Sequence, residues 1–568
     1  MDRYIEACSA IFSHFEASDG AAEDFLDSVL SEFAGASDYE AKLHRAMAFM
    51  CRVRNQSPSF VPISLLPPEI MSRILWFVER CCLPKSRFTR QKAQADRHPV
   101  HPEAALEVCY RWRQITLTSR NLWSHIDLDL TFMSQEKLFL RALAFAAKSK
   151  QAPIDLHMRI NSHYLDYQRL ANFFHTIATR IRSFELECGR TSYLLDETQS
   201  LLANLFSCVA PGALRRLHID AQSLEEPGFL VADSSNLLVR NGLISHPIPI
   251  TEPVFEGTLS SLTSIQLDGI YPYWTSRAYA GLVELDLEFS QNCSVDINIT
   301  EFELADLLRS SPGLQTLRFG LMITKETDFS SLAPDPVKLD ELRLIQLTGR
   351  YPDVQEAVLR MIYPGQLPLQ MAIEVTEHFS LLSSYWVEFI NFISRSKITQ
   401  LQIQGAVPFK VFLESSEIFP LLPQLQVLTL YGIVLGQAYE EILGDYDATS
   451  FLALLHNYNR GLCYQNLRVL RLVKCRIYWS DFRHMSGMHP TQLFILDRCE
   501  AVKARTRKRR FGQRWDWTDT LMDAALKICP TTVVQLKGTT GEFEDLNDFR
   551  LDSVSPRKYV RAPGGFAL

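Results

Sequence analysis

Thiol and imidazole side chains that could bind zinc come close together at one place in the sequence. Cys81 and Cys82 are adjacent, and His98 and His101 follow them. Structural zinc sites place a short spacer between paired cysteines, so that both thiolates reach one ion. Adjacent cysteines fit this spacing poorly. We therefore favour a helix end followed by a loop, and we predict no metal and no cofactor.

The familiar motifs of catalysis and nucleotide binding are absent from the sequence. It contains no G-x-x-x-x-G-K-[ST] phosphate loop, no G-x-G-x-x-G turn, no G-x-S-x-G elbow and no H-E-x-x-H pair. A catalytic triad can still assemble from residues that are distant in the sequence. We predict a protein that is not an enzyme, and we keep a hydrolase with a dispersed site as a less favoured alternative.

The densest run of charge is basic and extends from Lys503 to Arg510, with Arg514, Trp515 and Trp517 after it. Such a run is typical of a nuclear-import signal or of a patch for an anionic partner. The simpler interpretation, which we favour, is a solvated loop. Nucleic-acid binding is not expected, because the chain has a formal net charge of −7 and one basic loop supplies few phosphate contacts.

Charged side chains also alternate with apolar ones in a recurring pattern of the form L-x-x-L-x-L. Its second and third apolar residues would lie on one face of a short strand, because side chains alternate along a strand. The last hexad continues to Cys475 and Ile477, where the cysteine would cap the buried turn. The hexads are Ile181/Phe184/Leu186, Leu214/Leu217/Ile219, Leu262/Ile265/Leu267, Leu282/Leu285/Leu287, Leu314/Leu317/Phe319, Leu339/Leu342/Leu344, Ile398/Leu401/Ile403, Leu425/Leu428/Leu430 and Leu467/Leu470/Leu472.

Helical stretches, Phe302–Leu308 and Tyr446–Leu455 among them, separate several of these hexads. Strands that alternate with helices in this way predict an α/β solenoid with a curved parallel sheet and outer helices. Two intervals between hexads are too long for one repeat, the first from Leu214 to Leu262 and the second from Leu339 to Ile398. Either the repeats there have degenerated or loops such as Gln222–Pro253 project from the solenoid, and a strand at Met371–Val375 would fill the second interval.

Residues between the apolar positions would form the concave face of this sheet. We predict a surface with an acidic half and a more basic half, suited to a bipolar protein substrate; ordinary solvated strand residues are the alternative. The predicted substrate-binding residues are Asp268, Glu284, Asp286, Glu288, Arg318, Arg343, Tyr431 and Arg471.

Two amphipathic helices are predicted before the repeats, in the stretch from Leu66 to Leu128. Pro67 and Pro68 suit the first turn of a helix, whose N–H groups have no internal partner. Ile70, Ile74, Phe77 and Val78 follow on one helical face, and Ala105, Val108, Cys109, Trp112 and Ile115 repeat that face in a second helix, with Arg111 and Arg113 pointing away. Such short helices need each other and, in our interpretation, a partner to bury their apolar faces.

These residues resemble the F-box-like form abundant in mushroom-type (basidiomycete) fungi. The resemblance lies in Leu66-Pro67-Pro68-Glu69-Ile70, in Val108-Cys109 with Arg111-Trp112-Arg113, and in Leu122-Trp123-Ser124-His125-Ile126-Asp127-Leu128; the hexads likewise resemble the leucine-rich repeat. The resemblance implies a substrate receptor of a cullin–RING ubiquitin ligase, with a Skp-family adaptor and a protein target as partners. It implies that the adaptor-binding residues are Leu66, Pro67, Pro68, Glu69, Ile70, Ile74, Val108, Cys109 and Trp112.

Several of these residues could instead only pack the two helices together. The alternative function is a leucine-rich-repeat scaffold that recruits no ligase. The predicted domains are an N-terminal helical segment at 1–55, either a lead-in or a self-association element, an F-box-like domain at 62–130, a repeat domain at 150–540 and a polar tail at 541–568.

The 568-residue length exceeds the roughly 250–300 residues at which single cores stop growing, so several units or a repeat array are expected. The 12 cysteines are dispersed, the first residues do not resemble a signal peptide, and no apolar run is long enough to cross a bilayer. We expect a reducing intracellular location, in the cytoplasm or nucleus, and no membrane partner.

Overall fold

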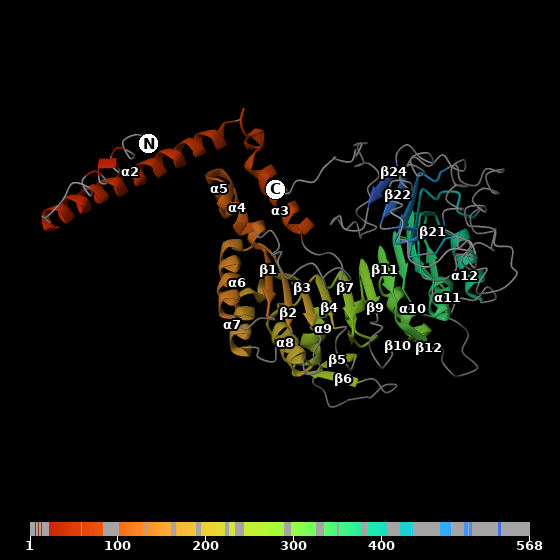
Figure 1. Ribbon diagram of the computed structural model, residues 1–568. Coiled ribbons are helices and arrows are strands. Elements are labelled where there is room, and N and C mark those ends of the chain that lie inside the picture. Colours follow the sequence, from red (N-terminus) through yellow and green to blue (C-terminus); the bar gives the residue numbers. More distant parts are fainter. Residues whose placement is uncertain are drawn as a thin grey trace, which may run out of the picture. The chain divides into compact units, whose positions relative to one another are not determined.

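The computed structural model divides the chain into two compact units, which we describe separately (Figure 1). Unit 1 comprises 1–124 with 147–152, and unit 2 comprises 125–146 with 153–568. The described residues are 6, 9–10, 13, 22–57, 59–82, 102–130, 135–160, 166–188, 195–221, 227–232, 244–288, 297–324, 334–348, 351–375, 384–405, 421–432, 434–435, 466–478, 493–497, 499–502 and 532–535. The basic run at 503–510, the pair His98 and His101, and the predicted tail lie outside them.

Unit 1 is helical and has a small core. Its long first helix, α2, is followed by shorter helices that pack around Met71, Ile115 and Trp123, all of them buried. The Trp123 indole N–H donates to the Thr116 carbonyl at 2.8 Å, and the Lys148 ammonium lies 3.8 Å from the centre of its ring. The helices are α2 (Ala22–Gln56), α3 (Pro68–Cys82), α4 (Pro102–Val108) and α5 (Tyr110–Thr118), with 3-10 turns η1 (Pro62–Leu65) and η2 (Arg120–Trp123).

The predicted second helix is in fact two helices, α4 and α5, that break at Cys109. The backbone of Cys109 is extended, and its sulfur accepts the Trp112 N–H at 3.5 Å as an N-cap. A residue in this conformation interrupts a helix but begins the next one. The two arginines do not simply point away: Arg111 donates to the Leu66 carbonyl, and Arg113 donates to the Leu106 carbonyl at 2.9 Å.

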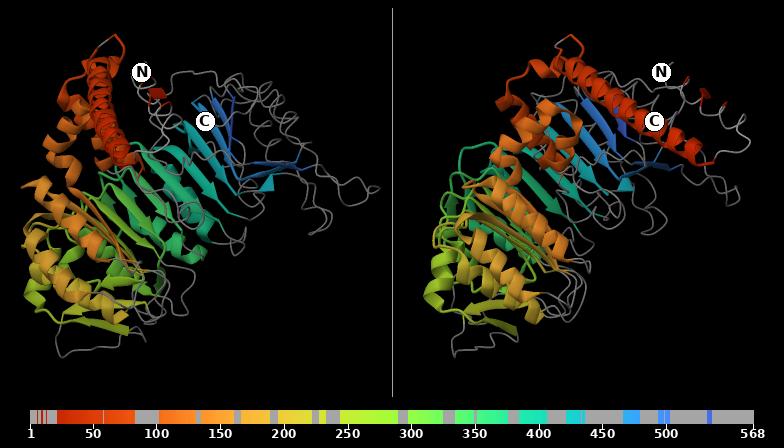
Figure 2. Two further views of the ribbon diagram at one scale, coloured as in Figure 1. Left: turned by 60° about the vertical axis from the view of Figure 1, so that its left-hand side comes forward. Right: turned by 90° about the vertical axis from the view of Figure 1, so that its left-hand side faces the viewer.

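Unit 2 is a leucine-rich-repeat solenoid built on one parallel sheet (Figure 2). Every described pair of neighbouring strands in this sheet is parallel, which requires a crossover segment after each strand. The strands, in spatial order, are β1 (His125–Asp129), β2 (Ile154–Ile160), β3 (Ile181–Cys188), β4 (Arg216–Asp220), β7 (Ser264–Asp268), β9 (Glu284–Glu288), β11 (Thr316–Phe319), β14 (Leu344–Leu347), β16 (Leu369–Glu374), β17 (Ile398–Gln404), β18 (Val427–Tyr431), β20 (Val469–Val473), β22 (Leu493–Asp497) and β24 (Thr532–Gln535).

The crossover helices lie on the outer side of this curved sheet (Figure 2). The predicted helix at 302–308 is present as α10. Thr300 and Glu303 form a capping box at its N-terminus. The predicted helix at 446–455 lies outside the described residues. The outer helices are α6 (Gln135–Ser149), which the division between units crosses, α7 (Tyr167–Ile177), α8 (Leu195–Cys208), α9 (Glu252–Leu259), α10 (Glu301–Arg309), α11 (Pro352–Met361) and α12 (Ser384–Ser394), with 3-10 turns η3 (Ala178–Arg180) and η4 (Arg277–Tyr279).

Small parallel sheets follow the main sheet along the solenoid. One of them lies mostly in the first long interval: residues 222–253 supply β5 and β6, which pair in the order β6-β5-β8, and α9 begins at Glu252. The strands of the small sheets are β5 (Gly228–Ala232), β6 (Ile244–Ile248) and β8 (Ile270–Pro272); β10 (Asn298–Thr300) and β12 (Met322–Thr324); β13 (Val337–Leu339) and β15 (Ile362–Pro364); β19 (Val434–Leu435), β21 (Arg476–Tyr478) and β23 (Glu500–Val502).

The apolar residues of all the predicted hexads are buried, but one hexad was assigned in the wrong register. Leu339 belongs to β13, which pairs with β15 outside the main sheet. In the main sheet, Leu317 pairs with Ile345 and Phe319 with Leu347, so the repeat reads Leu342/Ile345/Leu347. The strand predicted at 371–375 is present as β16.

The predicted cysteine cap is present as well. Cys475 is fully buried, and its thiol donates to the Leu430 carbonyl at 3.2 Å, in the preceding repeat. Cys499 repeats this contact with the Leu472 carbonyl at 3.2 Å. The thiols thus satisfy carbonyl groups at the turn where each strand ends.

Candidate functional site

Unit 1 exposes an apolar stripe along α3, formed by Ile70, Ile74, Phe77 and Val78, which we call the α3 stripe. Ile70 is 45%, Phe77 48% and Val78 41% exposed, while Ile74 is half-buried. Met71, which lies next to Val78 around the helix (i, i+7), is only 1% exposed and belongs to the core. The apolar face of α3 is therefore wider than its buried part, and the α3 stripe is the part that is available to a partner.

The other predicted adaptor-binding residues lie at the ends of the short helices. Leu66 is half-buried and ends η1, and Pro67, Pro68 and Glu69 are exposed in the first turn of α3. Val108 is exposed at the end of α4, Cys109 is half-buried at the break, and Trp112 is half-buried in α5. The bond from Arg111 to the Leu66 carbonyl connects these two groups. Their role in adaptor binding stays a prediction.

Unit 2 presents the sheet surface opposite the helices, which we call the concave face. In β4, for example, Leu217 and Ile219 are buried towards the helices, and Arg216, His218 and Asp220 alternate with them. The parallel register brings the residues of this face into rows across the sheet. One row runs Asp127, His157, Glu185, His218, Gln266, Asp286, Arg318, Gln346, Ala372, Gln402, Thr429 and Arg471.

The predicted substrate-binding residues lie along this sheet, with one exception. Asp268 and Asp286 are buried within it, Glu284 is exposed and Glu288 is half-buried. Tyr431, half-buried, accepts a hydrogen bond from the Lys474 ammonium. The exception is Arg343, an exposed residue one position before β14, where Gln346 takes the place in the row.

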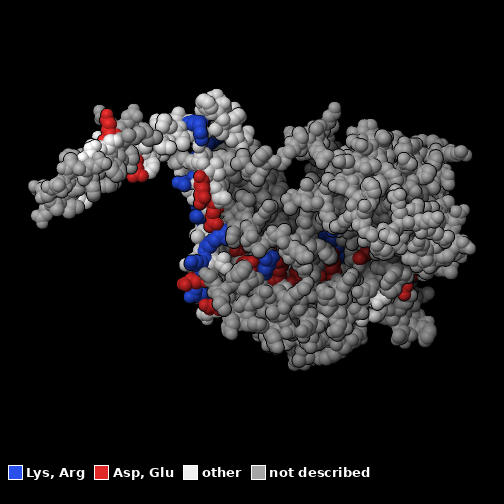
Figure 3. Space-filling model, in the orientation of Figure 1, with Lys and Arg blue, Asp and Glu red and all other residues white. Residues whose placement is uncertain are grey.

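Charge on this face is paired rather than separated into two halves. The Arg318 guanidinium lies 3.7 Å from the Asp286 carboxylate, and Arg471 lies 3.7 Å from Asp497. On the face drawn in Figure 3, acidic and basic side chains are interspersed. A bipolar partner would therefore meet a mixed surface, and its binding to these residues remains a prediction.

The middle of the concave face is rich in amides, a feature that sequence reasoning missed. Gln370, Gln400, Gln402 and Gln404 occupy neighbouring places on β16 and β17 and are half-buried. Amide groups both donate and accept hydrogen bonds, so this area suits the polar surface or backbone of a protein. The predicted hexad Ile398/Leu401/Ile403 already contained this signal, because Gln400, Gln402 and Gln404 alternate with its buried residues.

The first strands carry a histidine–carboxylate cluster that sequence reasoning also missed. His125 Nε2 lies 3.1 Å and His157 Nδ1 2.9 Å from the same Asp127 oxygen, Oδ1. His218 Nδ1 lies 3.2 Å from Glu185 Oε1. Burial would raise the pKa of the Asp127 carboxyl, but hydrogen bonds from the two imidazoles hold it well below its usual range.

Two ion-pair groups continue from this cluster. The Arg159 Nε donates to Glu187 Oε2 at 2.9 Å, and the Arg159 Nη2 lies 2.8 Å from the same oxygen. Arg182 and Arg216 both donate to the buried Asp155 carboxylate, at 2.9 and 3.3 Å at the shortest. These contacts join β2 with β3 and β4 and hold the side chains of the face in fixed positions.

Comparison with known proteins gives distant structural similarity alone. No protein-family model and no curated protein matches the sequence. Among solved structures, the chain is similar to the Rad7 and Elc1 complex of yeast (10% identity over 81% of this chain and 94% of that chain, TM-score 0.33). It is also similar to an internalin of Listeria monocytogenes (11% identity over 60% of this chain and 84% of that chain, TM-score 0.24).

None of the helices that the structure describes is both long enough and apolar enough to cross a bilayer.

Proposed function

We propose that this chain is the substrate-recognition subunit of a Skp–cullin–F-box ubiquitin ligase, of the F-box-like kind found in mushroom-type fungi. The observation that carries the proposal is the α3 stripe, in which Ile70, Phe77 and Val78 are each about half exposed on one side of a helix. An amphipathic helix with an outward apolar face is suited to an apolar groove on a partner. In this proposal the partner is a Skp-family adaptor, which is what the resemblance of these motifs to the F-box implies.

The concave face of unit 2 would hold the protein to be modified. It combines fixed ion pairs, exposed Glu284 and the amide area around Gln402, all on one continuous sheet. Concave repeat surfaces bind extended areas of other proteins. In this proposal the chain brings a target close to the ubiquitin-charged enzyme, in the cytoplasm or nucleus, and the covalent chemistry belongs to partner subunits.

The alternative, a repeat scaffold that recruits no ligase, predicts no adaptor binding. The test is co-expression of the full chain with a Skp-family adaptor, followed by affinity purification and measurement of the dissociation constant. Ile70→Asp with Phe77→Asp should weaken binding by at least about 2 kcal/mol, about 30-fold, because a charge would enter an apolar contact. The matched control is Leu140→Asp on α6, an apolar and exposed position on another helix.

Retained adaptor affinity in the double variant, or no adaptor recovered with the wild-type chain, would exclude the ligase proposal and favour the scaffold. Circular dichroism of both variants would show that the substitutions leave the fold intact. Because Ile70 and Phe77 are exposed, replacing them should cost little folding stability.

A further inference from the structure

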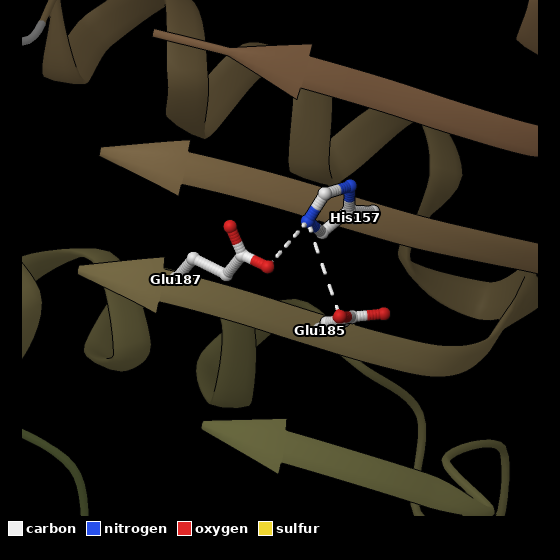
Figure 4. A group of neighbouring side chains, drawn as sticks. All are labelled: His157, Glu185 and Glu187. Atoms are coloured by element: carbon white, nitrogen blue, oxygen red, sulfur yellow. Dashed lines mark ion pairs between the residues drawn. The ribbon is translucent and has the colours of Figure 1, made fainter. Parts of the chain in front are cut away.

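Three potential metal ligands meet on the concave face, from two neighbouring strands (Figure 4). His157 comes from β2, and Glu185 and Glu187 come from alternate positions of β3. His157 Nε2 lies 3.6 Å from Glu187 Oε1 and 4.0 Å from Glu185 Oε1. One ligand atom from each residue lies within 4.8 Å of the other two.

The two ring nitrogens of His157 face different groups. Nδ1 lies 2.9 Å from the Asp127 carboxylate, which accepts but cannot donate, so this nitrogen is suited to carry the hydrogen of the ring. Nε2 is buried, makes no hydrogen bond and faces carboxylate oxygens of Glu185 and Glu187. One imidazole nitrogen and two carboxylate oxygens that face one another form a donor set for a cation.

The separations of the ligand atoms can be compared with those around a bound ion. Ligand bonds of about 2.0 Å in tetrahedral geometry separate two ligand atoms by about 3.3 Å. The observed 3.6 and 4.0 Å exceed that separation, and all three ligand atoms lie within 4.8 Å of one another, so binding an ion requires the carboxylates to move inwards.

Each ligand is also supported by a neighbouring group. Asp127 accepts the Nδ1–H of His157, the carboxylate–histidine arrangement that orients an imidazole towards a metal. Arg159 holds the other oxygen of Glu187, and His218 lies 3.2 Å from Glu185.

We propose that His157, Glu185 and Glu187 bind a divalent transition-metal ion of the zinc type. One imidazole and two carboxylates suit zinc, and three protein ligands leave a coordination position open towards the concave face. This assignment is independent of the proposed ligase function. It concerns unit 2 alone and survives if no adaptor binds.

The test is zinc titration of the full-length, metal-stripped chain against a chromophoric chelator. The wild-type chain should bind one ion that is lost, or weakened at least about 10-fold, in His157→Gln and in Glu187→Gln. The matched control is His125→Gln, which touches the same Asp127 oxygen but contributes no ligand. Cobalt should replace zinc and give visible bands without the near-ultraviolet band of thiolate ligands, which distinguishes this site from cysteine binding.

Zinc binding that persists in both ligand variants, or the absence of binding by the wild-type chain, would overturn the proposal.

Discussion

Replacing Gly269 by alanine should destabilise the solenoid much more than the same change at Gly212. Both glycines have positive φ, +86° and +83°, so alanine would meet a similar backbone strain of about 1–2 kcal/mol at each. The added Cβ at Gly269 would lie 2.6 Å from the Ala221 carbonyl oxygen, whereas at Gly212 nothing lies within 4 Å. The gain from a less flexible unfolded chain, about 0.4–1 kcal/mol, is common to both variants and cancels in the comparison.

The difference between the two variants therefore isolates the steric contact. A clash with backbone, which cannot move away as a flexible side chain can, should add about 1–3 kcal/mol at Gly269. Urea unfolding of the full chain measures the total. Hydrogen exchange at the Ala221 amide, which donates to the Asp268 carbonyl at 2.9 Å, reports the local loss between β4 and β7. Equal losses in the two variants, within about 0.5 kcal/mol, would refute the close approach of these strand ends.

Other substitutions test the core, the caps and the fixed ion pairs. Trp123→Ala should cost about 3–5 kcal/mol in thermal or chemical unfolding, because a fully buried indole and its hydrogen bond to Thr116 are lost together. Cys475→Ala should cost about 0.5–1.5 kcal/mol by removing the thiol hydrogen bond to the Leu430 carbonyl, and Cys475→Ser should recover part of that loss; equal stability of the two would contradict the capping role. Asp155→Asn should lower the urea concentration at which the solenoid unfolds, because two arginines lose their shared carboxylate. The stability of this variant should also depend less on salt concentration.

Periodicity predicted most of the solenoid because burial repeats with the strand. The residues of the hexads are buried, and the strand at 371–375 is present as β16. The slip at Leu339 occurred because two apolar hexads overlap there in the sequence, and only pairing with β11 decides between them. Arg343 was placed on the concave face by the same slip.

The remaining differences between the predicted and the observed structure have two separate causes. The helical pattern continues across Cys109, so periodicity could not reveal the break that its sulfur caps. β1 and β2 precede the predicted hexads, and without them Asp127 and His157 could not be aligned with Glu185 and Glu187. The histidine–carboxylate cluster therefore depended on register between strands, which no single segment of the sequence contains.

The central claim is that two separate surfaces, one on each unit, bind an adaptor and a target protein. Proximity labelling with the full chain tests it most directly. It compares two double variants: Ile70→Asp combined with Phe77→Asp on the α3 stripe, and Glu284→Lys combined with Gln402→Lys on the concave face. We predict that the first pair loses the adaptor and cullin but keeps the other labelled proteins, and that the second pair does the reverse. Loss of both groups in either variant, or an adaptor signal that neither variant changes, would contradict the account.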